Sequence, residues 1–193
     1  MRVIVASHNS AKIAEFKDLL KELKLEVIGL NELGMLEAID ETGNSFIENA
    51  RIKAKAIAKS FPQDLIIADD SGICIAAFDL KPGIYSARFL SEYPDYKDKN
   101  KKVLELLENQ SNRKAFFLCA IHIIYQQQGF DIQEVVYGNI AMESSGEDGF
   151  GYDPIFVPKG YNQTFAEVPE LKSKISHRAK ALKKAVEYVQ FLY

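Results

Sequence analysis

Two adjacent carboxylates, Asp69 and Asp70, have the best setting for chemistry in this sequence. The apolar run Leu65–Ala68 leads into them and predicts a short strand that is buried on both faces. In open α/β sheets, ligands bind beyond the carboxyl ends of the strands, where such acids can act as a general base or hold a metal. Adjacent strand residues point to opposite faces, so both acids can serve one site only if the chain turns here, which Gly72 after Ser71 would allow.

The same stretch has a simpler interpretation, in which a polar turn at the strand end hydrogen-bonds its own backbone. Two further acids, Asp40 and Glu41, precede a predicted helix that Ser45 and Glu48 begin as a capping box. Taken alone, Asp40 and Glu41 are better explained as solvated charges. If all these acids come together, the pKa of a carboxylate among them is raised, which favours general-base catalysis.

A polar segment near the amino terminus, Ser7–Lys12 (SHNSAK), joins a predicted strand, Arg2–Ala6, to a predicted helix. The amino terminus of a helix favours phosphate through its free N–H groups and dipole, and Lys12 adds a positive charge there. The segment lacks the GxxxxGK pattern of a Walker A loop. As an isolated motif, the segment is better explained by helix capping through Asn9 or Ser10.

A glycine-rich segment, Ser144–Pro154, carries three glycines between positions 146 and 151, together with Phe150 and Tyr152. Turns explain glycines but not the aromatic residues among them, which suit stacking on a nucleobase. Ser176 is predicted to cap a final helix, whose first turn contains Arg178. Because a cation opposes the helix dipole at that end, we expect Arg178 to serve a ligand.

The remaining patterns predict an α/β fold. They indicate a weak strand at Leu25–Ile28, an extended piece at Ile73–Phe78, a helix through Val103–Leu107, and an antiparallel pair formed by Ala115–Tyr125 and Ile132–Met142. We interpret His122, which lies within an apolar strand, as a core histidine rather than a catalytic one.

Composition sets the class of protein. A chain of 193 residues with 47% hydrophobic and 26% charged residues fits one soluble domain, or one domain with two lobes. A net charge of −3 gives no indication of nucleic acid or membrane as a partner. The beginning of the chain has no signal-peptide pattern. Cys74 and Cys119 are far apart and form no CxxC motif, so we expect a reducing, cytoplasmic setting without a zinc or disulfide framework.

Six blocks in this order resemble the inosine-triphosphate pyrophosphatase family: SHNSAK, DETG with FIENA, ADDSG, PGIYSARF, DGFGYDPIF and TFAE with ISHRAKAL. The resemblance covers Val3 to Leu182. It implies one domain over residues 1–193, with two lobes around a long twisted mixed sheet flanked by helices and an active site in the cleft between them. It also implies a homodimer, Mg²⁺ dependence, and hydrolysis of ITP, dITP or XTP to the nucleoside monophosphate and pyrophosphate by water attack on the α-phosphate.

The resemblance also assigns roles to individual residues. Asp70 would activate the attacking water, and the acids that hold Mg²⁺ would be Asp40, Glu41, Asp69 and Asp70. Ser71 would contact the substrate, and the contacts to the triphosphate would come from Ser7, His8, Asn9, Ser10, Ala11, Lys12 and Lys172. The contacts to the purine would come from Phe150, Gly151, Tyr152, Asp153, His177 and Arg178.

The N–H groups of Arg178 would favour a purine with a keto oxygen, which can accept from them. Adenine would place its amino group, another donor, against them. The first block departs from the family, which usually has Thr-Gly-Asn where this chain has Ser-His-Asn. Ser7 keeps the hydroxyl, whereas His8 replaces a glycine that lets backbone approach phosphate, so it either cramps the loop or adds a donor.

Two other functions are weighed against this one. A phosphatase of the haloacid-dehalogenase type, with an aspartyl nucleophile, would have a strand followed by DxD and no use for the aromatic loop. A nucleotide-binding regulator that no longer hydrolyses would not need the full set of acids.

Overall fold

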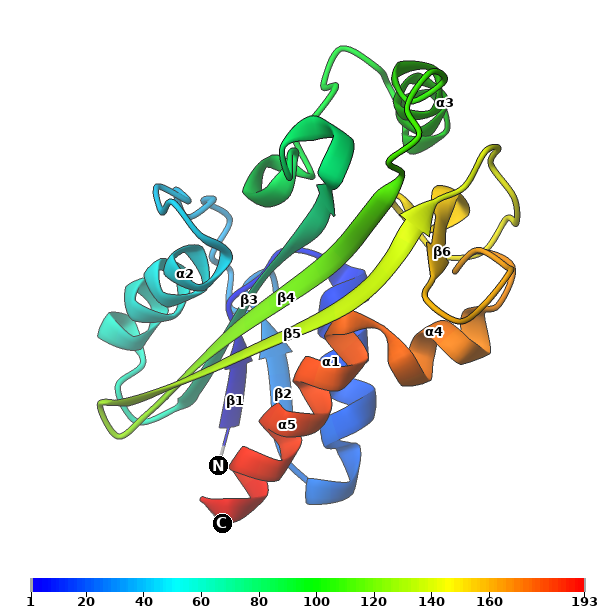
Figure 1. Cartoon of the computed structure of the whole chain (residues 1–193). Helices are drawn as coiled ribbons and strands as arrows, with labels where there is room; N and C mark the ends of the chain where they lie inside the picture. The colour runs from blue at the N-terminus through cyan, green and yellow to red at the C-terminus, as the bar shows by residue number, and fades with distance from the viewer. Residues whose placement is uncertain (1, 193) are drawn as a thin grey trace. The chain divides into compact units, whose positions relative to one another are not determined.

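The computed structural model describes residues 2–192, which form one mixed six-stranded sheet with helices around it (Figure 1). The strand order is β2-β1-β3-β4-β5-β6. Strand β1 is parallel to both β2 and β3, whereas β5 and β6 are antiparallel. The strands are β1 (Arg2–Val5), β2 (Glu26–Gly29), β3 (Leu65–Ile75), β4 (Lys114–Tyr125), β5 (Gln128–Ile140) and β6 (Phe156–Pro158). The α/β class and the mixed sheet are confirmed.

The α-helices are α1 (Ser10–Leu20), α2 (Phe46–Ser60), α3 (Tyr96–Leu106), α4 (Pro169–Ile175) and α5 (His177–Phe191). Three predicted caps are confirmed. Asn9 caps α1, the Ser45 hydroxyl accepts from the Glu48 amide at the start of α2, and the Ser176 hydroxyl accepts from the Ala179 amide in α5. Helix α3 begins earlier than predicted, because Asp95 caps it by accepting from the Asp98 amide. No helix within residues 2–192 is both long enough and apolar enough to cross a membrane.

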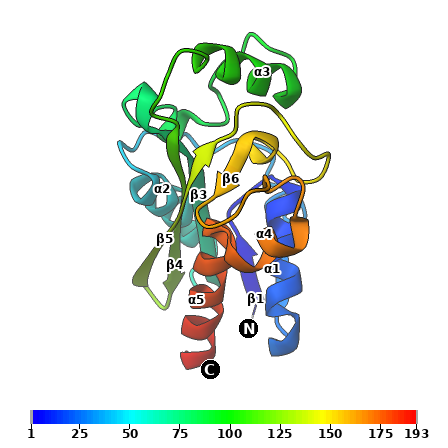
Figure 2. The ribbon, with the colours of Figure 1, turned by 45° about the vertical axis from the view of Figure 1, so that its right-hand side comes forward.

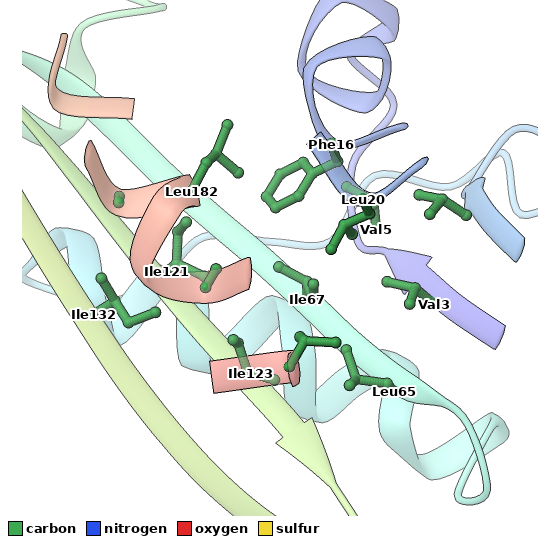
Figure 3. Close-up of a cluster of buried hydrophobic side chains, with 14 of the residues drawn as sticks. Val3, Val5, Phe16, Leu20, Leu65, Ile67, Ile121, Ile123, Ile132 and Leu182 are labelled. Atoms are coloured by element: carbon green, nitrogen blue, oxygen red, sulfur yellow. The ribbon is translucent and has the colours of Figure 1, made fainter. Parts of the chain in front are cut away.

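The chain divides into two compact units. Unit 1 comprises residues 1–70, 119–134 and 180–193, and unit 2 comprises residues 71–118 and 135–179. In unit 1, alternate residues of β3 face two apolar layers. Leu65 and Ile67 pack with side chains of α1 and α5 (Figure 3), whereas Ile66 and Ala68 pack with α2. Figure 2 shows α1 and α5 side by side along the sheet.

Unit 2 has a separate core, which is rich in aromatic residues. It joins the second part of β3 to α3, β6 and the loop before β6, through Ile73, Ile75, Val103, Tyr152, Phe156 and Phe165. The rings of Phe117 and Phe156 meet edge to face with centroids 4.8 Å apart.

The predicted turn at Gly72 is wrong, because β3 continues from Leu65 through the two acids to Ile75. Gly72 is needed for close packing instead. A Cβ atom at Gly72 would lie 2.3 Å from Ser86 Oγ and 2.4 Å from the Gly83 carbonyl oxygen. Asp69 and Asp70 therefore point to opposite faces of one extended strand.

The predicted pair of long strands forms a hairpin with a tighter connection than the sequence indicates. The connection is Gln126–Gln127, and both residues have positive φ, at 47° and 66°. Tight hairpins need such residues, because left-handed turns match the twist of the strands. Within the hairpin, His122 is buried and its Nδ1 lies 2.6 Å from Asp131 Oδ1, which confirms it as a core histidine with a polar partner.

Candidate functional site

The SHNSAK loop of unit 1 is held by its own side chains. Asn9 Oδ1 accepts from the amides of Ala11 and Lys12, at 3.0 Å and 3.2 Å, and the Asn9 amide donates to Ser7 Oγ at 3.1 Å. The capping interpretation of this loop is therefore confirmed. The loop still ends at the positive pole of α1, which keeps phosphate binding possible.

His8 takes part in the hydrogen bonding that holds this loop. It has no positive φ, so this position does not require glycine. Its Nε2 lies 2.8 Å from the Met35 carbonyl oxygen and must carry the hydrogen, because a carbonyl oxygen only accepts. The Leu30 amide also donates to the Ser7 carbonyl at 3.2 Å. The His8 ring thus fastens the loop to the segment after β2.

Lys12 and Asp69, which the sequence assigns to phosphate and to metal, bind each other. Lys12 Nζ lies 2.8 Å from Asp69 Oδ2, and the Asp69 side chain is 1% exposed. An ammonium compensates a buried carboxylate that would otherwise be costly. A ligand that binds Lys12 must therefore either share Lys12 with Asp69 or displace Asp69 from it.

Lys53, on α2, is a site residue that the sequence analysis missed. Its Nζ lies 2.6 Å from Glu41 Oε1 and donates to the Asp69 carbonyl oxygen, also at 2.6 Å. Burial acts to lower the pKa of Lys53, but the charges of Asp69, Asp70 and Glu41 outweigh it and raise that pKa above its usual value. One ammonium thus lies within electrostatic reach of three acids.

Asn49 is the second residue missed, and it holds Asp70. Its Nδ2 donates to Asp70 Oδ2 at 3.0 Å, and its Oδ1 accepts from the Gly43 amide at 2.8 Å. Burial raises the pKa of Asp70 above its usual value, Lys53 and Asn49 oppose that shift, and Glu41 adds to it. The spacing of Asn49 and Lys53, four residues apart on one helix face, is the signal that could have found both.

The acids do not form a ready-made metal cage. Among residues 2–192, no three or more His, Cys, Asp or Glu side chains gather closely enough to hold a metal ion. Asp40 is exposed, and Glu41, Asp69 and Asp70 lie near Lys53. Mg²⁺ usually binds one or two carboxylates together with substrate phosphates and water. The carboxylate oxygens of Glu41, Asp69 and Asp70 are therefore suitable ligands for Mg²⁺ that is already bound to a triphosphate.

The glycine-rich loop of unit 2 folds around Asp153. Its Oδ2 accepts from the Phe150 amide at 2.8 Å and from Lys172 Nζ at 2.6 Å. Gly149 has φ +84°, and a Cβ there would lie 2.4 Å from Asp153 Oδ2, so both its conformation and its lack of a side chain are required. Lys172, which the resemblance assigns to the triphosphate, lies on α4 and contacts this loop through Asp153 and Phe150.

Phe150 is the exposed ring of this loop. Its side chain is 45% exposed, and its face carries Lys172 Nζ at 4.2 Å and Arg178 Cζ at 5.5 Å from the ring centroid. Arg178 is buried and its Nη2 donates to Ser71 Oγ at 2.9 Å. The ring of His177 stacks on Phe117 with centroids 4.8 Å apart. Two cations, one from α4 and one from α5, thus lie over the face of the Phe150 ring.

Tyr152 differs from the sequence expectation. It is 3% exposed, and its hydroxyl donates to the Ser86 carbonyl oxygen at 2.9 Å. Burial, reinforced by Tyr96, raises the pKa of this phenol. Its ring belongs to the unit 2 core, so stacking on a planar ligand is left to Phe150.

Comparison with known proteins adds independent evidence. The profile of the Ham1 family matches residues 3–188. The chain is 42% identical over 192 residues to the dITP/XTP pyrophosphatase of Caldanaerobacter subterraneus subsp. tengcongensis, covering 98% of this chain and 96% of that protein. It is 44% identical over 185 residues to the dITP/XTP pyrophosphatase of Bacillus subtilis, covering 94% and 93%. The solved Ham1 protein of Staphylococcus aureus matches at a TM-score of 0.90 and 36% identity, with 100% of both chains covered. The chain therefore belongs to the Ham1 family.

Proposed function

We propose that this protein hydrolyses deaminated purine nucleoside triphosphates, dITP, XTP and ITP, to the monophosphate and pyrophosphate. The observation that carries the proposal is a buried carboxylate with a raised pKa, Asp70, on a strand that also bears Asp69. Two relatives with at least 42% identity are named dITP/XTP pyrophosphatases, which supports the same reaction class.

Asp70 acts as the general base. It accepts a proton from water as the oxygen bonds to the α-phosphorus, and the bond to the bridging oxygen breaks to release pyrophosphate. Burial brings the pKa of Asp70 closer to neutral than that of an ordinary carboxyl, which improves it as a base. The hydrogen bond from Asn49 to Oδ2 holds the carboxylate in one orientation.

The triphosphate binds to groups of unit 1. The amino terminus of α1 supplies a positive pole, and the Lys12 ammonium exchanges its partner Asp69 for a phosphate oxygen. Mg²⁺ would be held by one or two of the carboxylates of Glu41, Asp69 and Asp70 together with the phosphates, with Asp40 nearby in sequence. It would neutralise charge on the phosphates and on the departing pyrophosphate.

The purine binds to groups of unit 2. Phe150 stacks on the base, and Arg178 and Lys172 donate to the oxygen at its six position. We assign Lys172 to the base rather than to the triphosphate, because it pairs with Asp153 and covers the Phe150 ring. An adenine amino group would face these donors and lose their hydrogen bonds. A homodimer, which the resemblance implies, and a cytoplasmic location, which the cysteine usage indicates, complete the proposal.

Hydrolysis of ITP in heavy-oxygen water tests the proposal. We expect inosine monophosphate and pyrophosphate, with the label in the monophosphate. Label in free orthophosphate, without added pyrophosphatase, would mean attack at the γ position and would overturn the mechanism. A trapped aspartyl-phosphate would favour the phosphatase alternative, and the absence of turnover with Mg²⁺ and enzyme in excess would favour a binding protein.

A further inference from the structure

Helix α3 of unit 2 contacts the glycine-rich loop through Asn100. This side chain is 1% exposed, and its Nδ2 donates to the Gly151 carbonyl oxygen at 2.9 Å. Gly151 has φ +67°, in the left-handed region that glycine adopts readily. The bond joins positions 51 residues apart in the chain.

The chemistry of Asn100 favours a role in placing the loop over a role in stability. Its Oδ1 is buried and has no hydrogen-bond partner among residues 2–192. A buried acceptor without a partner destabilises a fold, whereas an apolar side chain of the same shape does not. The hydrogen bond from Nδ2–H to the Gly151 carbonyl is the contact through which this amide acts on the loop.

A second contact reinforces this one. Tyr96, one turn earlier on α3, meets the Tyr152 ring edge to face at 5.5 Å and 84°. Asn100 and Tyr96 thus hold the two residues that follow Phe150. Phe150 is the ring that faces Lys172 and Arg178, so a shift of Gly151 carries it away from both cations.

We propose that Asn100 is a positioning residue for purine selectivity. By fixing the Gly151 carbonyl, it sets where the Phe150 ring lies against Lys172 and Arg178, and so how well the six-position oxygen is recognised. The inference rests on the proposed function for its substrate, but the contact itself can be tested without a substrate.

The variants are Asn100→Asp, which keeps the shape and removes the donor, and Asn100→Leu, which removes all polarity. Asn100→Gln keeps a donor on a longer side chain, and Lys101→Ala is an exposed control on the same helix. Hydrogen exchange reports the loop, kcat/KM for ITP and ATP reports selectivity, and the inhibition constant of inorganic tripolyphosphate reports triphosphate binding.

We expect the Asp and Leu variants to exchange the amides of residues 150–153 faster and to lose about 3- to 10-fold in the ITP-to-ATP ratio, the effect of one hydrogen bond. Asn100→Gln should partly restore the slow amide exchange and the ITP-to-ATP ratio, and Lys101→Ala should leave both at their wild-type values. The inhibition constant of tripolyphosphate should stay within about twofold of the wild-type value in every variant. Unchanged exchange, or faster exchange with an unchanged ratio, would overturn the inference. If the wild type lacks the ITP preference, the proposed function fails instead, whatever the exchange data show.

Discussion

The functional groups of the two units are built differently. In unit 1, buried acids and lysines neutralise one another, as Lys12 does with Asp69 and Lys53 with Glu41. In unit 2, Lys172 and Arg178 lie over an exposed aromatic face. The first arrangement keeps its charges satisfied until another charged species arrives, and the second places two cationic donors over the face of an exposed ring.

This difference separates two demands of the proposed reaction. A charge network can exchange partners with phosphate and metal but says nothing about a base, because every nucleoside triphosphate carries the same phosphates. An aromatic face with positioned donors can distinguish bases by their edges. Substitutions in unit 1 should therefore change turnover for all substrates, and those in unit 2 should change the choice among them.

Asp70→Asn should give the largest effect. The amide keeps the shape and can still accept from Asn49, but it cannot take a proton from water. We expect kcat for ITP to fall at least about 100-fold, the scale of general-base catalysis. Steady-state kinetics, with circular dichroism to verify folding, measures this. Wild-type turnover in a folded Asp70→Asn protein would remove Asp70 from the mechanism.

Lys53→Met should act next most strongly, because it removes the ammonium that Asp69, Asp70 and Glu41 share. The free energy of unfolding should fall by about 1–3 kcal/mol, the worth of a charge-assisted hydrogen bond in a partly buried site. The pKa of Asp70 should rise, so the acidic limb of kcat/KM should move to higher pH. Lys55→Met, at an exposed position of the same helix, is the control and should change neither quantity.

Arg178→Ala should reduce the preference for ITP over ATP by about 1–3 kcal/mol, since one charged donor to the base is lost. The ratio of kcat/KM for the two substrates measures it. Lys12→Ala is the counterpart in unit 1 and should lower kcat/KM for ITP and for ATP by the same factor. An unchanged ratio in Arg178→Ala, or a changed ratio in Lys12→Ala, would break the division between the units.

The smallest effect concerns stability and pH. Because burial raises the pKa of Asp70 in the folded state, ionised Asp70 destabilises the fold at neutral pH. Asp70→Asn should therefore be more stable than the wild type at pH 7. The difference in free energy of unfolding between the variant and the wild type should shrink as pH falls through the raised pKa of Asp70 in the folded state. It should vanish below the ordinary pKa of aspartate, which holds in the unfolded state. Urea unfolding at several pH values measures this difference, and a wild type more stable at pH 7 would contradict it.

Local patterns were sufficient for much of the fold. Apolar spacing gave α1 and α5, and the caps at Asn9, Ser45 and Ser176 follow from side chains that bond their own helix. Helix α4 was missed, because seven residues that begin at Pro169 carry too little periodicity to predict a helix.

The error at Gly72 and the missed residues have one physical cause. A polar run such as DDSG looks like the end of a strand unless partners on both faces are known. Here Lys12, Asn49 and Arg178 satisfy Asp69, Asp70 and Ser71, and they come from three different helices. The sequence analysis also attributed a raised carboxyl pKa to neighbouring acids, whereas burial is the largest cause for Asp70.

Gly72 has a consequence for mapping this protein by saturation mutagenesis. Any side chain at this position would collide with Ser86 and Gly83, so every substitution should score as inactive in a growth or activity screen. Those scores would equal the scores of Asp70 variants, although one residue is needed for assembly of the core and the other for the reaction. A parallel screen for cellular abundance would separate them, because Gly72 variants should be depleted and Asp70→Asn should accumulate normally.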